Sequence, residues 1–274
     1  MREQSSDAAR GYSALERAGV PDARYDAREI FVRLGGLSRA QAMLPDAESL
    51  KAEVADAIAR RVRREPLQYI IGEVGFYKEV YEVSPDCLIP RSDTEILVEY
   101  AVSHIPDGES FIDLCTGSGC IGISVLKNTR AASALLVDIS PDALHTAQRN
   151  AQKNGVCDRT ELLEADVLCE PVGGEVFCVL SNPPYVRPEV YETLEREIFY
   201  EPRAAFVAAD GGMEFYKRIT ELYRGRIKEG GFIAYEIGYD QEEAIREVAR
   251  AADMSCETVR DLSGNPRVAV LRRR

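Results

Sequence analysis

The segment at residues 181–185, Ser-Asn-Pro-Pro-Tyr, combines residue types that could bind a planar NH2 group. The Asn182 side chain offers an oxygen that accepts one N–H. Pro183 and Pro184 lack N–H donors and hold φ at about −65°, so the turn is stiff and the Pro183 carbonyl stays free to accept the second N–H. Tyr185 supplies a flat face on which an amide or a nucleobase can stack. Asn-Pro and Pro-Pro are also common in ordinary turns, so the rest of the chain must decide between the two interpretations.

A glycine-rich turn lies upstream, between the apolar residues 111–114 and a helix-like stretch that starts at residue 120. The glycines of such a turn allow a close approach of a ligand to the backbone. The Gly-x-Gly spacing is ambiguous by itself, because Gly122 stands where the third glycine of a pyrophosphate site would be. Asp113 favours a cationic ligand, since a carboxylate repels a pyrophosphate and attracts an ammonium or sulfonium group. The turn consists of Cys115, Thr116, Gly117, Ser118 and Gly119.

Two further acids follow predicted strands. Asp138 ends the apolar residues 134–137, about twenty positions after the glycine turn, which is the placement expected for binding a ribose diol. Asp166 follows residues 161–165 and could reach an adenine amino group. Each aspartate alone could be a helix N-cap or part of a solvated turn. Three acids at successive strand ends together favour a nucleoside-containing cofactor.

These motifs together resemble the class I S-adenosylmethionine-dependent methyltransferases, and more closely the release-factor glutamine N5-methyltransferases, the HemK family. Asn-Pro-Pro-Tyr is shared with adenine-N6 methyltransferases, whereas Ile-Pro-Arg-x-Asp-Thr-Glu at residues 89–95 is much more specific to this family. The resemblance extends over essentially the whole chain. It rests in addition on residues 64–72, 113–119, 200–204, 210–212, 236–238 and 261–264.

Three positions depart from the usual family pattern. Cys115 and Ser92 stand where glycine and proline are usual. Val167 stands where an aromatic residue is often found, so this position offers no aromatic ring for an adenine to stack on.

The resemblance implies an α/β fold with a Rossmann-like, mostly parallel seven-stranded sheet. It also implies an enzyme that transfers a methyl group from S-adenosylmethionine to the side-chain amide N5 of the glutamine in the Gly-Gly-Gln motif of a peptide chain release factor, leaving S-adenosylhomocysteine. The implied catalytic residues are Asn182, Pro183 and Tyr185. The implied cofactor-binding residues are Asp113, Cys115, Thr116, Gly117, Ser118, Gly119, Asp138, Asp166, Val167 and Asn182. The implied substrate-binding residues are Asn182, Pro183, Pro184, Tyr185, Arg91, Thr94 and Glu95.

The elements that position these residues follow from the periodicity. Residues 1–64 show apolar positions at helical spacing and no strand pattern, which predicts a small helical domain. The resemblance implies that this domain docks the release factor, and a role as a spacer is the alternative. Residues 65–85 contain β-prone residues and glycines, which predicts a linking β-hairpin. Residues 86–274 alternate strands and helices and form the catalytic domain. Within it we expect strands at 111–114, 134–138, 161–165, 176–180 and 232–237, helices at 213–228 and 241–251, and an antiparallel pair around Val259 and residues 268–271.

The composition of the chain argues against several classes of partner and of binding site. At 274 residues with 45% hydrophobic residues the chain can bury a large core, and no apolar run reaches the roughly 18 residues of a membrane span. The polar residues 1–7 do not resemble a secretory signal, so we expect a cytoplasmic protein. Seven cysteines without a Cys-x-x-Cys pair and only two histidines argue against a disulfide framework or a metal site. A net charge of −12 disfavours non-specific binding to nucleic acid. We expect a monomer.

Other functions remain open at this point. An adenine-N6 nucleic-acid methyltransferase could use the same Asn-Pro-Pro-Tyr turn on a flipped base, although no separate basic recognition region is evident. A glutamine methyltransferase acting on a ribosomal protein would have identical chemistry and differ only in its docking surface. A dinucleotide oxidoreductase is disfavoured by Asp113, and a non-catalytic binding protein is disfavoured by the full set of site residues.

Overall fold

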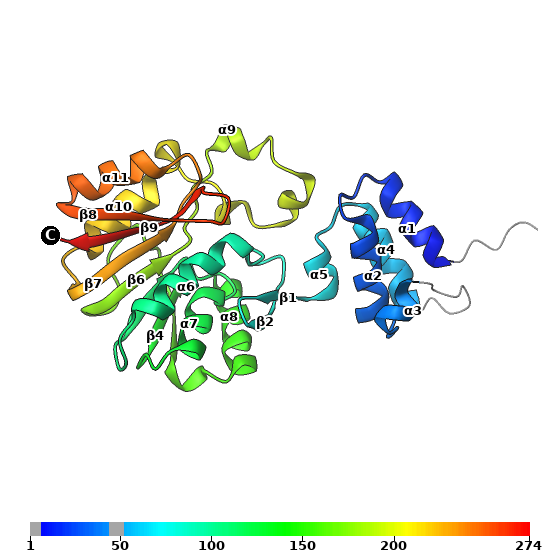
Figure 1. Ribbon diagram of the computed structural model, residues 1–274, viewed down its shortest axis with the longest axis horizontal. Helices are drawn as coiled ribbons and strands as arrows, with labels where there is room; N and C mark the ends of the chain where they lie inside the picture. Colours follow the sequence, from blue (N-terminus) through cyan, green and yellow to red (C-terminus); the bar gives the residue numbers. More distant parts are fainter. Residues whose placement is uncertain (1–6, 44–51) are drawn as a thin grey trace, which may run out of the picture. The chain divides into compact units, whose positions relative to one another are not determined.

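A computed structural model describes residues 7–43 and 52–274 (Figure 1). Residues 1–6, which include most of the polar start of the chain, lie outside the described residues. The chain divides into two units, one of residues 1–73 with 195–200 and the other of residues 74–194 with 201–274. Within the described ranges, no helix is both long enough and apolar enough to span a membrane.

The first unit is helical, as predicted. Its helices bury apolar residues that recur three and four positions apart, such as Ala27, Ile30 and Phe31 in α2. These side chains meet Leu15 of α1 and Val54 of α4 in one cluster of buried residues. The helices are α1 (Asp7–Arg17), α2 (Ala23–Arg33), α3 (Arg39–Met43), α4 (Ala52–Val62) and α5 (Leu67–Ile71).

The predicted hairpin is present but starts later than expected. It consists of β1 (Glu73–Phe76) and β2 (Glu79–Glu82), whereas residues Leu67–Ile71 form helix α5 and not a strand. Leu67 and Ile70 are one helical turn apart and are buried in the cluster of the first unit. Burial there outweighs the β propensity of the isoleucines. Gly72 ends the helix with a left-handed φ of 86°.

The second unit contains the predicted seven-stranded, mostly parallel sheet, in the order β5-β4-β3-β6-β7-β9-β8. The first five strands in this order are parallel, and β9 is antiparallel to both β7 and β8. The order of the parallel strands reverses between β3 and β6, which is where open α/β sheets bind their ligands. The strands are β3 (Phe111–Leu114), β4 (Ala134–Asp138), β5 (Thr160–Glu164), β6 (Val176–Ser181), β7 (Ile227–Glu236), β8 (Met254–Arg260) and β9 (Pro266–Arg273).

Helices cover both faces of this sheet (Figure 1). Successive strand residues point to opposite faces, so Phe111 packs with α6, α7 and α8 while Ile112 packs with α10 and α11. The two clusters of buried residues enclose the sheet and fix the ends of its strands. The helices are α6 (Glu95–His104), α7 (Cys120–Asn128), α8 (Pro141–Asn154), α10 (Glu214–Tyr223) and α11 (Glu242–Ala251), with the short α9 (Pro188–Tyr191) after β6.

The helix predicted over 213–228 ends earlier, at Tyr223, and β7 begins at Ile227 and not at residue 232. Ile227 is fully buried and pairs with Val176, and the register shifts before Phe232 pairs with Cys178. Gly231 makes this irregular start possible, because a Cβ there would lie 2.0 Å from the Phe177 carbonyl oxygen. The sequence pattern indicated a break at the glycines, but the strand continues through it as a bulge.

Candidate active site

The carboxyl ends of β3, β6 and β7 bring three polar residues to one edge of the sheet. Asp113 lies near the end of β3, Asn182 follows β6 directly, and Glu236 ends β7. The register aligns these ends, since Leu114 pairs with Ser181 and Ser181 pairs with Tyr235. The Ser181 hydroxyl also donates a 2.7 Å hydrogen bond to the Leu114 carbonyl. The candidate site therefore lies at the point where the strand order reverses.

The glycine turn needs the small residues that it contains. Gly117 and Gly119 have φ values of 54° and 80°, in the left-handed region. A Cβ at Gly119 would lie 2.7 Å from Ile123 Cδ1, and one at Gly122 would lie 2.8 Å from Leu136 Cδ1. Gly122 therefore allows α7 to pack closely against the sheet.

Cys115 occupies a left-handed position in the same turn, with a φ of 57°. This conformation costs a residue with a Cβ about 1 kcal/mol more than glycine. The left-handed torsion gives a physical reason for the family's usual glycine at this place.

Asp113 supports the turn from below. It is 0% exposed, and its Oδ2 accepts hydrogen bonds from the Thr116 hydroxyl at 2.6 Å and from the Gly122 N–H at 3.0 Å. Burial raises its pKa to about 7. Its Oδ1 is buried and has no hydrogen-bond partner in the described part of the chain, and neither has the Ser118 hydroxyl. Two orphaned polar groups beside a glycine turn fit a ligand that carries N–H or O–H donors.

The other two acids lie at the neighbouring strand ends, as the sequence predicts. Asp138 accepts hydrogen bonds from the Gly117 N–H at 2.8 Å and the Ser140 N–H at 3.0 Å, and burial raises its pKa. Asp166 follows β5 and accepts from the Leu168 N–H at 2.9 Å, next to the buried Val167. Each carboxylate oriented by backbone donors keeps lone pairs for a further donor, such as a hydroxyl or an amino group.

The Asn-Pro-Pro-Tyr turn presents two open acceptors. Pro183 and Pro184 are buried, and Asn182 and Tyr185 are half-buried. The Asn182 Nδ2 donates a 3.3 Å hydrogen bond to the Thr94 hydroxyl oxygen. Among residues 7–43 and 52–274, no donor reaches the Asn182 Oδ1 or the Pro183 carbonyl. Both oxygens therefore keep their lone pairs free of hydrogen bonds from the described residues.

Two residues with no role predicted from the sequence, Gln241 and Gly212, contact the backbone of this turn. The Tyr185 carbonyl accepts a 3.3 Å hydrogen bond from Gln241 Nε2, and Gln241 Oε1 accepts from the Gly238 N–H. A Cβ at Gly212 would lie 2.3 Å from the Tyr185 carbonyl oxygen. Residues 211–212 and 236–238 belong to the motifs of the resemblance. The fold adds that Gly212 lies against the turn and that Gly238 binds the Gln241 side chain that contacts it.

The substrate-binding residues predicted in the segment 89–95 separate into two groups. Thr94 is 2% exposed and faces Asn182 and Glu236. The Arg91 guanidinium forms an ion pair with Glu201, which also accepts from the Ile89 N–H at 2.9 Å. Glu95 accepts from the Tyr77 N–H at 2.9 Å. The structure thus brings Thr94 to the Asn-Pro-Pro-Tyr turn, whereas Arg91 and Glu95 contact other segments.

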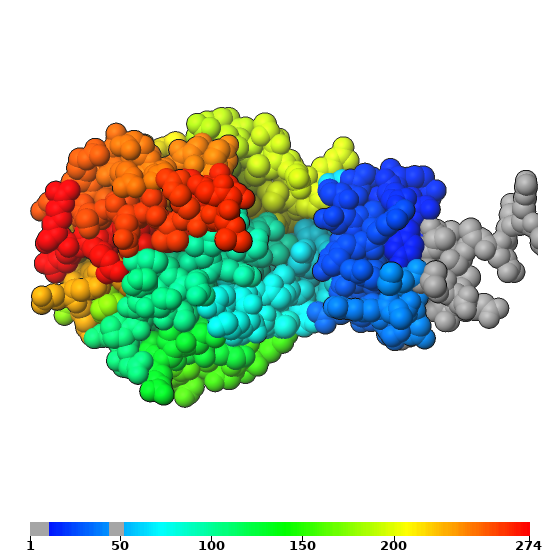
Figure 2. Space-filling model, viewed as in Figure 1, coloured from blue at the N-terminus to red at the C-terminus, as the bar shows by residue number. Residues whose placement is uncertain are grey.

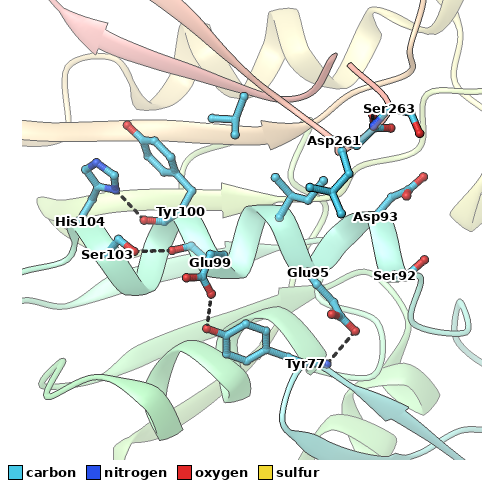
Figure 3. A pocket seen from close by; sticks show the side chains of 13 residues that line it. Tyr77, Ser92, Asp93, Glu95, Glu99, Tyr100, Ser103, His104, Asp261 and Ser263 are labelled. Atoms are coloured by element: carbon cyan, nitrogen blue, oxygen red, sulfur yellow. Dashed lines mark hydrogen bonds between the residues drawn. The ribbon is translucent and has the colours of Figure 1, made fainter. Parts of the chain in front are cut away.

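A groove of about 690 Å³ lies on the outer side of this segment (Figure 3). It runs along α6, below the connection between β8 and β9, and the same two regions border each other on the surface (Figure 2). The groove is lined by Ser92, Asp93 and Glu95 but not by Thr94 or Asn182. It is therefore separate from the candidate active site.

Two family descriptions match the chain. "PrmC N-terminal domain" matches residues 9–72 and "Methyltransferase small domain" matches residues 92–215. Two solved structures share the fold of the larger unit. A ribosomal protein L11 methylase from Lactobacillus delbrueckii subsp. bulgaricus aligns with a TM-score of 0.51 at 19% identity, covering 67% of this chain and 80% of that one. A methyltransferase from Pyrococcus furiosus aligns with a TM-score of 0.53 at 18% identity, covering 70% and 86%.

Curated relatives are similar over nearly the whole length. A release factor glutamine methyltransferase from Caulobacter vibrioides is 36% identical over 265 residues, which cover 93% of this chain and 91% of the relative. A protein of the same name from Geobacter sulfurreducens is 36% identical and covers 96% and 93%. Another from Moorella thermoacetica is 33% identical and covers 100% and 99%.

Proposed function

This chain belongs to the release factor glutamine methyltransferase family, and from that membership we propose that it methylates the side-chain amide N5 of the glutamine in the Gly-Gly-Gln motif of a peptide chain release factor. The observation that carries the proposal is the rigid turn with two open acceptors, Asn182 Oδ1 and the Pro183 carbonyl, beside the glycine turn that follows β3. A primary amide has two N–H donors, so the two acceptors match it in number.

The chemistry that the turn must promote is difficult, because the lone pair of an amide nitrogen is delocalised into its carbonyl. Two acceptors that take both N–H groups would orient the nitrogen and stabilise the positive charge that develops on it. Bound S-adenosylmethionine would supply an electrophilic methyl group and retain the electron pair of the broken S–CH3 bond as S-adenosylhomocysteine. The methylated nitrogen is acidic and gives its extra proton to water, so no strong base is required. Tyr185 would pack against the planar amide, with Pro184 fixing the direction of the chain.

The cofactor site that we propose uses the orphaned groups at the glycine turn. Asp113 and the backbone from Cys115 to Gly119 would hold the methionine portion, with the Ser118 hydroxyl as one donor or acceptor. Asp138 would bind the ribose diol, and Asp166 and Val167 would lie against the adenine. The ammonium and hydroxyl groups of the cofactor would donate hydrogen bonds that these carboxylates can accept.

The remaining parts of the proposal concern recognition. A single glutamine offers little surface, so we propose that residues 1–64 dock the release factor and that residues 65–85 connect this domain to the catalytic domain at 86–274. We propose that Arg91 and Glu95 hold the wall beside Thr94 through their contacts with Glu201 and Tyr77. The enzyme would act as a monomer in the cytoplasm.

The test is incubation of the purified protein with methyl-labelled cofactor and one acceptor at a time. We expect label on the glutamine of the Gly-Gly-Gln tripeptide, located by peptide mass spectrometry, and none on a release factor in which that glutamine is replaced by glutamate. Ribosomal proteins, DNA and RNA serve as competing acceptors. Label on one of these and not on the release factor would overturn the proposal.

A further inference from the structure

A line of hydrogen bonds joins three side chains from three separate segments and ends at the Asn182 amide. The Thr94 hydroxyl donates to Oε2 of Glu236, and Asn182 Nδ2 donates to the Thr94 hydroxyl oxygen. Thr94 lies in the short helix η1 (Ser92–Thr94) and is 2% exposed, and Glu236 at the end of β7 is 4% exposed. None of the roles given above to the cofactor or to the substrate uses Glu236.

The number of available protons fixes the direction of these hydrogen bonds. An ionised carboxylate has no proton and can only accept, so the single proton of the Thr94 hydroxyl is committed to Glu236. The Thr94 oxygen can then only accept, and the Asn182 side chain must turn its NH2 group toward it. The Asn182 Oδ1 consequently faces away from Thr94, where no donor in the described part of the chain reaches it.

We propose that Glu236, acting through Thr94, is a positioning residue that fixes which end of the Asn182 amide faces the substrate. The inference rests on the proposed function, because it concerns the acceptor that orients the glutamine amide. Neither Glu236 nor Thr94 touches the reacting atoms. Their role is to hold Asn182 in the one orientation that can accept an N–H.

Protonation of Glu236 would reverse the direction of the hydrogen bonds that join Glu236, Thr94 and Asn182. A protonated carboxyl donates to the Thr94 oxygen, which frees the Thr94 proton to bond to Asn182 Oδ1 and turns the NH2 group toward the substrate. The pKa of Glu236 is raised to about 7 by burial, so this reversal falls near neutral pH. The productive form is the ionised one, and turnover should rise as pH increases through about 7. The titratable or charged groups that influence Glu236 from the surrounding elements are Asp93, Arg91, Arg267, Tyr185, Tyr216 and Cys120.

The kinetic test uses substitutions that keep size and change the hydrogen bonds. Thr94→Val should lower kcat by about 10-fold to 100-fold with cofactor affinity unchanged, and Thr94→Ser should recover most of the loss. Glu236→Gln cannot ionise but can still accept from Thr94 through its side-chain oxygen, so it should abolish the rise of kcat around neutral pH. Thr220→Val is the matched control, because Thr220 is also buried but its hydroxyl bonds to the Tyr235 hydroxyl and not to Thr94, Asn182 or Glu236. It should keep the wild-type pH profile.

A second measurement tests the hydrogen bonds from Glu236 through Thr94 to Asn182 in the absence of substrate. The Asn182 side-chain NH2 resonances, assigned by comparison with Asn182→Ala, should shift with a midpoint near the pKa of Glu236 and stop shifting in Thr94→Val. A wild-type kcat in Thr94→Val, a wild-type pH profile in Glu236→Gln, or Asn182 NH2 resonances that do not change with pH would overturn the positioning role. A wild-type protein that methylates no release factor would instead defeat the proposed function, and the NMR titration would still decide the inference.

Discussion

Asn182 is the side chain on which the proposed catalysis depends most directly. Removing its oxygen in Asn182→Ala takes away one of the two acceptors that would orient the glutamine amide, without touching the glycine turn. We expect kcat to fall by at least about 100-fold, while the Kd for S-adenosylmethionine changes by less than about threefold. Single-turnover kinetics and calorimetry measure the two quantities separately. An equal loss of both would contradict the role assigned to Asn182.

Asp113 allows a prediction about protons. Its raised pKa of about 7 means that part of the population is protonated at neutral pH, and a cationic group bound at or near its orphaned Oδ1 would favour the ionised form. Binding of S-adenosylmethionine should therefore release protons near pH 7, and affinity should increase as pH rises through that value. Calorimetry in buffers of different ionisation enthalpy measures the release.

The control for this proton release comes from the second carboxyl with a similar pKa. Asp113→Asn can keep both hydrogen bonds to Thr116 and Gly122 through its side-chain oxygen, and it should bind cofactor without releasing protons. Glu236→Gln should release them as the wild type does. If proton release persists in Asp113→Asn and disappears in Glu236→Gln, the released proton comes from Glu236 and the prediction for Asp113 is wrong.

The turns that follow the strands offer a comparison between adjacent glycines. Gly211 and Gly212 have φ values of 64° and 88°, so alanine is strained at either position. A Cβ at Gly211 meets nothing within 4 Å, whereas a Cβ at Gly212 would lie 2.3 Å from the Tyr185 carbonyl oxygen. Gly212→Ala should therefore displace the Asn-Pro-Pro-Tyr turn and lower kcat by about 10-fold or more beyond Gly211→Ala, since small displacements at a reacting group are costly.

Thermal unfolding of both glycine variants separates strain from displacement. The left-handed torsion should cost each variant about 1 kcal/mol of stability, and the close contact should add to this only in Gly212→Ala. Identical activity in the two variants would mean that the turn does not rely on contact with Gly212.

The positions of β3, β4 and β6 were predictable, but the start of β7 and the contacts between the strand ends were not. Alternating and continuous apolar runs located β3, β4 and β6 to within a residue or two, and these strands bring Asp113, Asp138 and Asn182 to one edge of the sheet. The role of Glu236 depends on the pairing of Ser181 with Tyr235, and no local pattern reveals the register between β6 and β7. Helix α5 was missed for a similar reason, because burial in a distant cluster decides its conformation.

The division into units does not follow the order of the chain. The segment Glu195–Tyr200 lies between two parts of the catalytic unit in sequence, yet it belongs to the helical unit. Its Glu197 accepts from Arg61 at 3.0 Å and from Arg64 at 2.6 and 2.8 Å. Arg61 is 6% exposed and is also paired with Asp26 at 2.6 Å. The helical unit therefore depends on a residue that a fragment ending at residue 73 would lack.

Glu197→Gln tests this dependence. The substitution keeps the size of the side chain but removes the charge that the two arginines share, leaving Arg61 with the Asp26 carboxylate and the Glu65 carbonyl. We expect the helical unit to lose about 1 to 3 kcal/mol of stability, because hydrogen bonds to a partly buried charge are worth about that much. Glu195→Gln is the matched control, since Glu195 is exposed and lies two residues earlier in the same segment. Hydrogen exchange of α2 and α4 should accelerate in Glu197→Gln and stay at the wild-type rate in Glu195→Gln. Equal exchange in the two variants would mean that residues 195–200 rest on the helices without stabilising them.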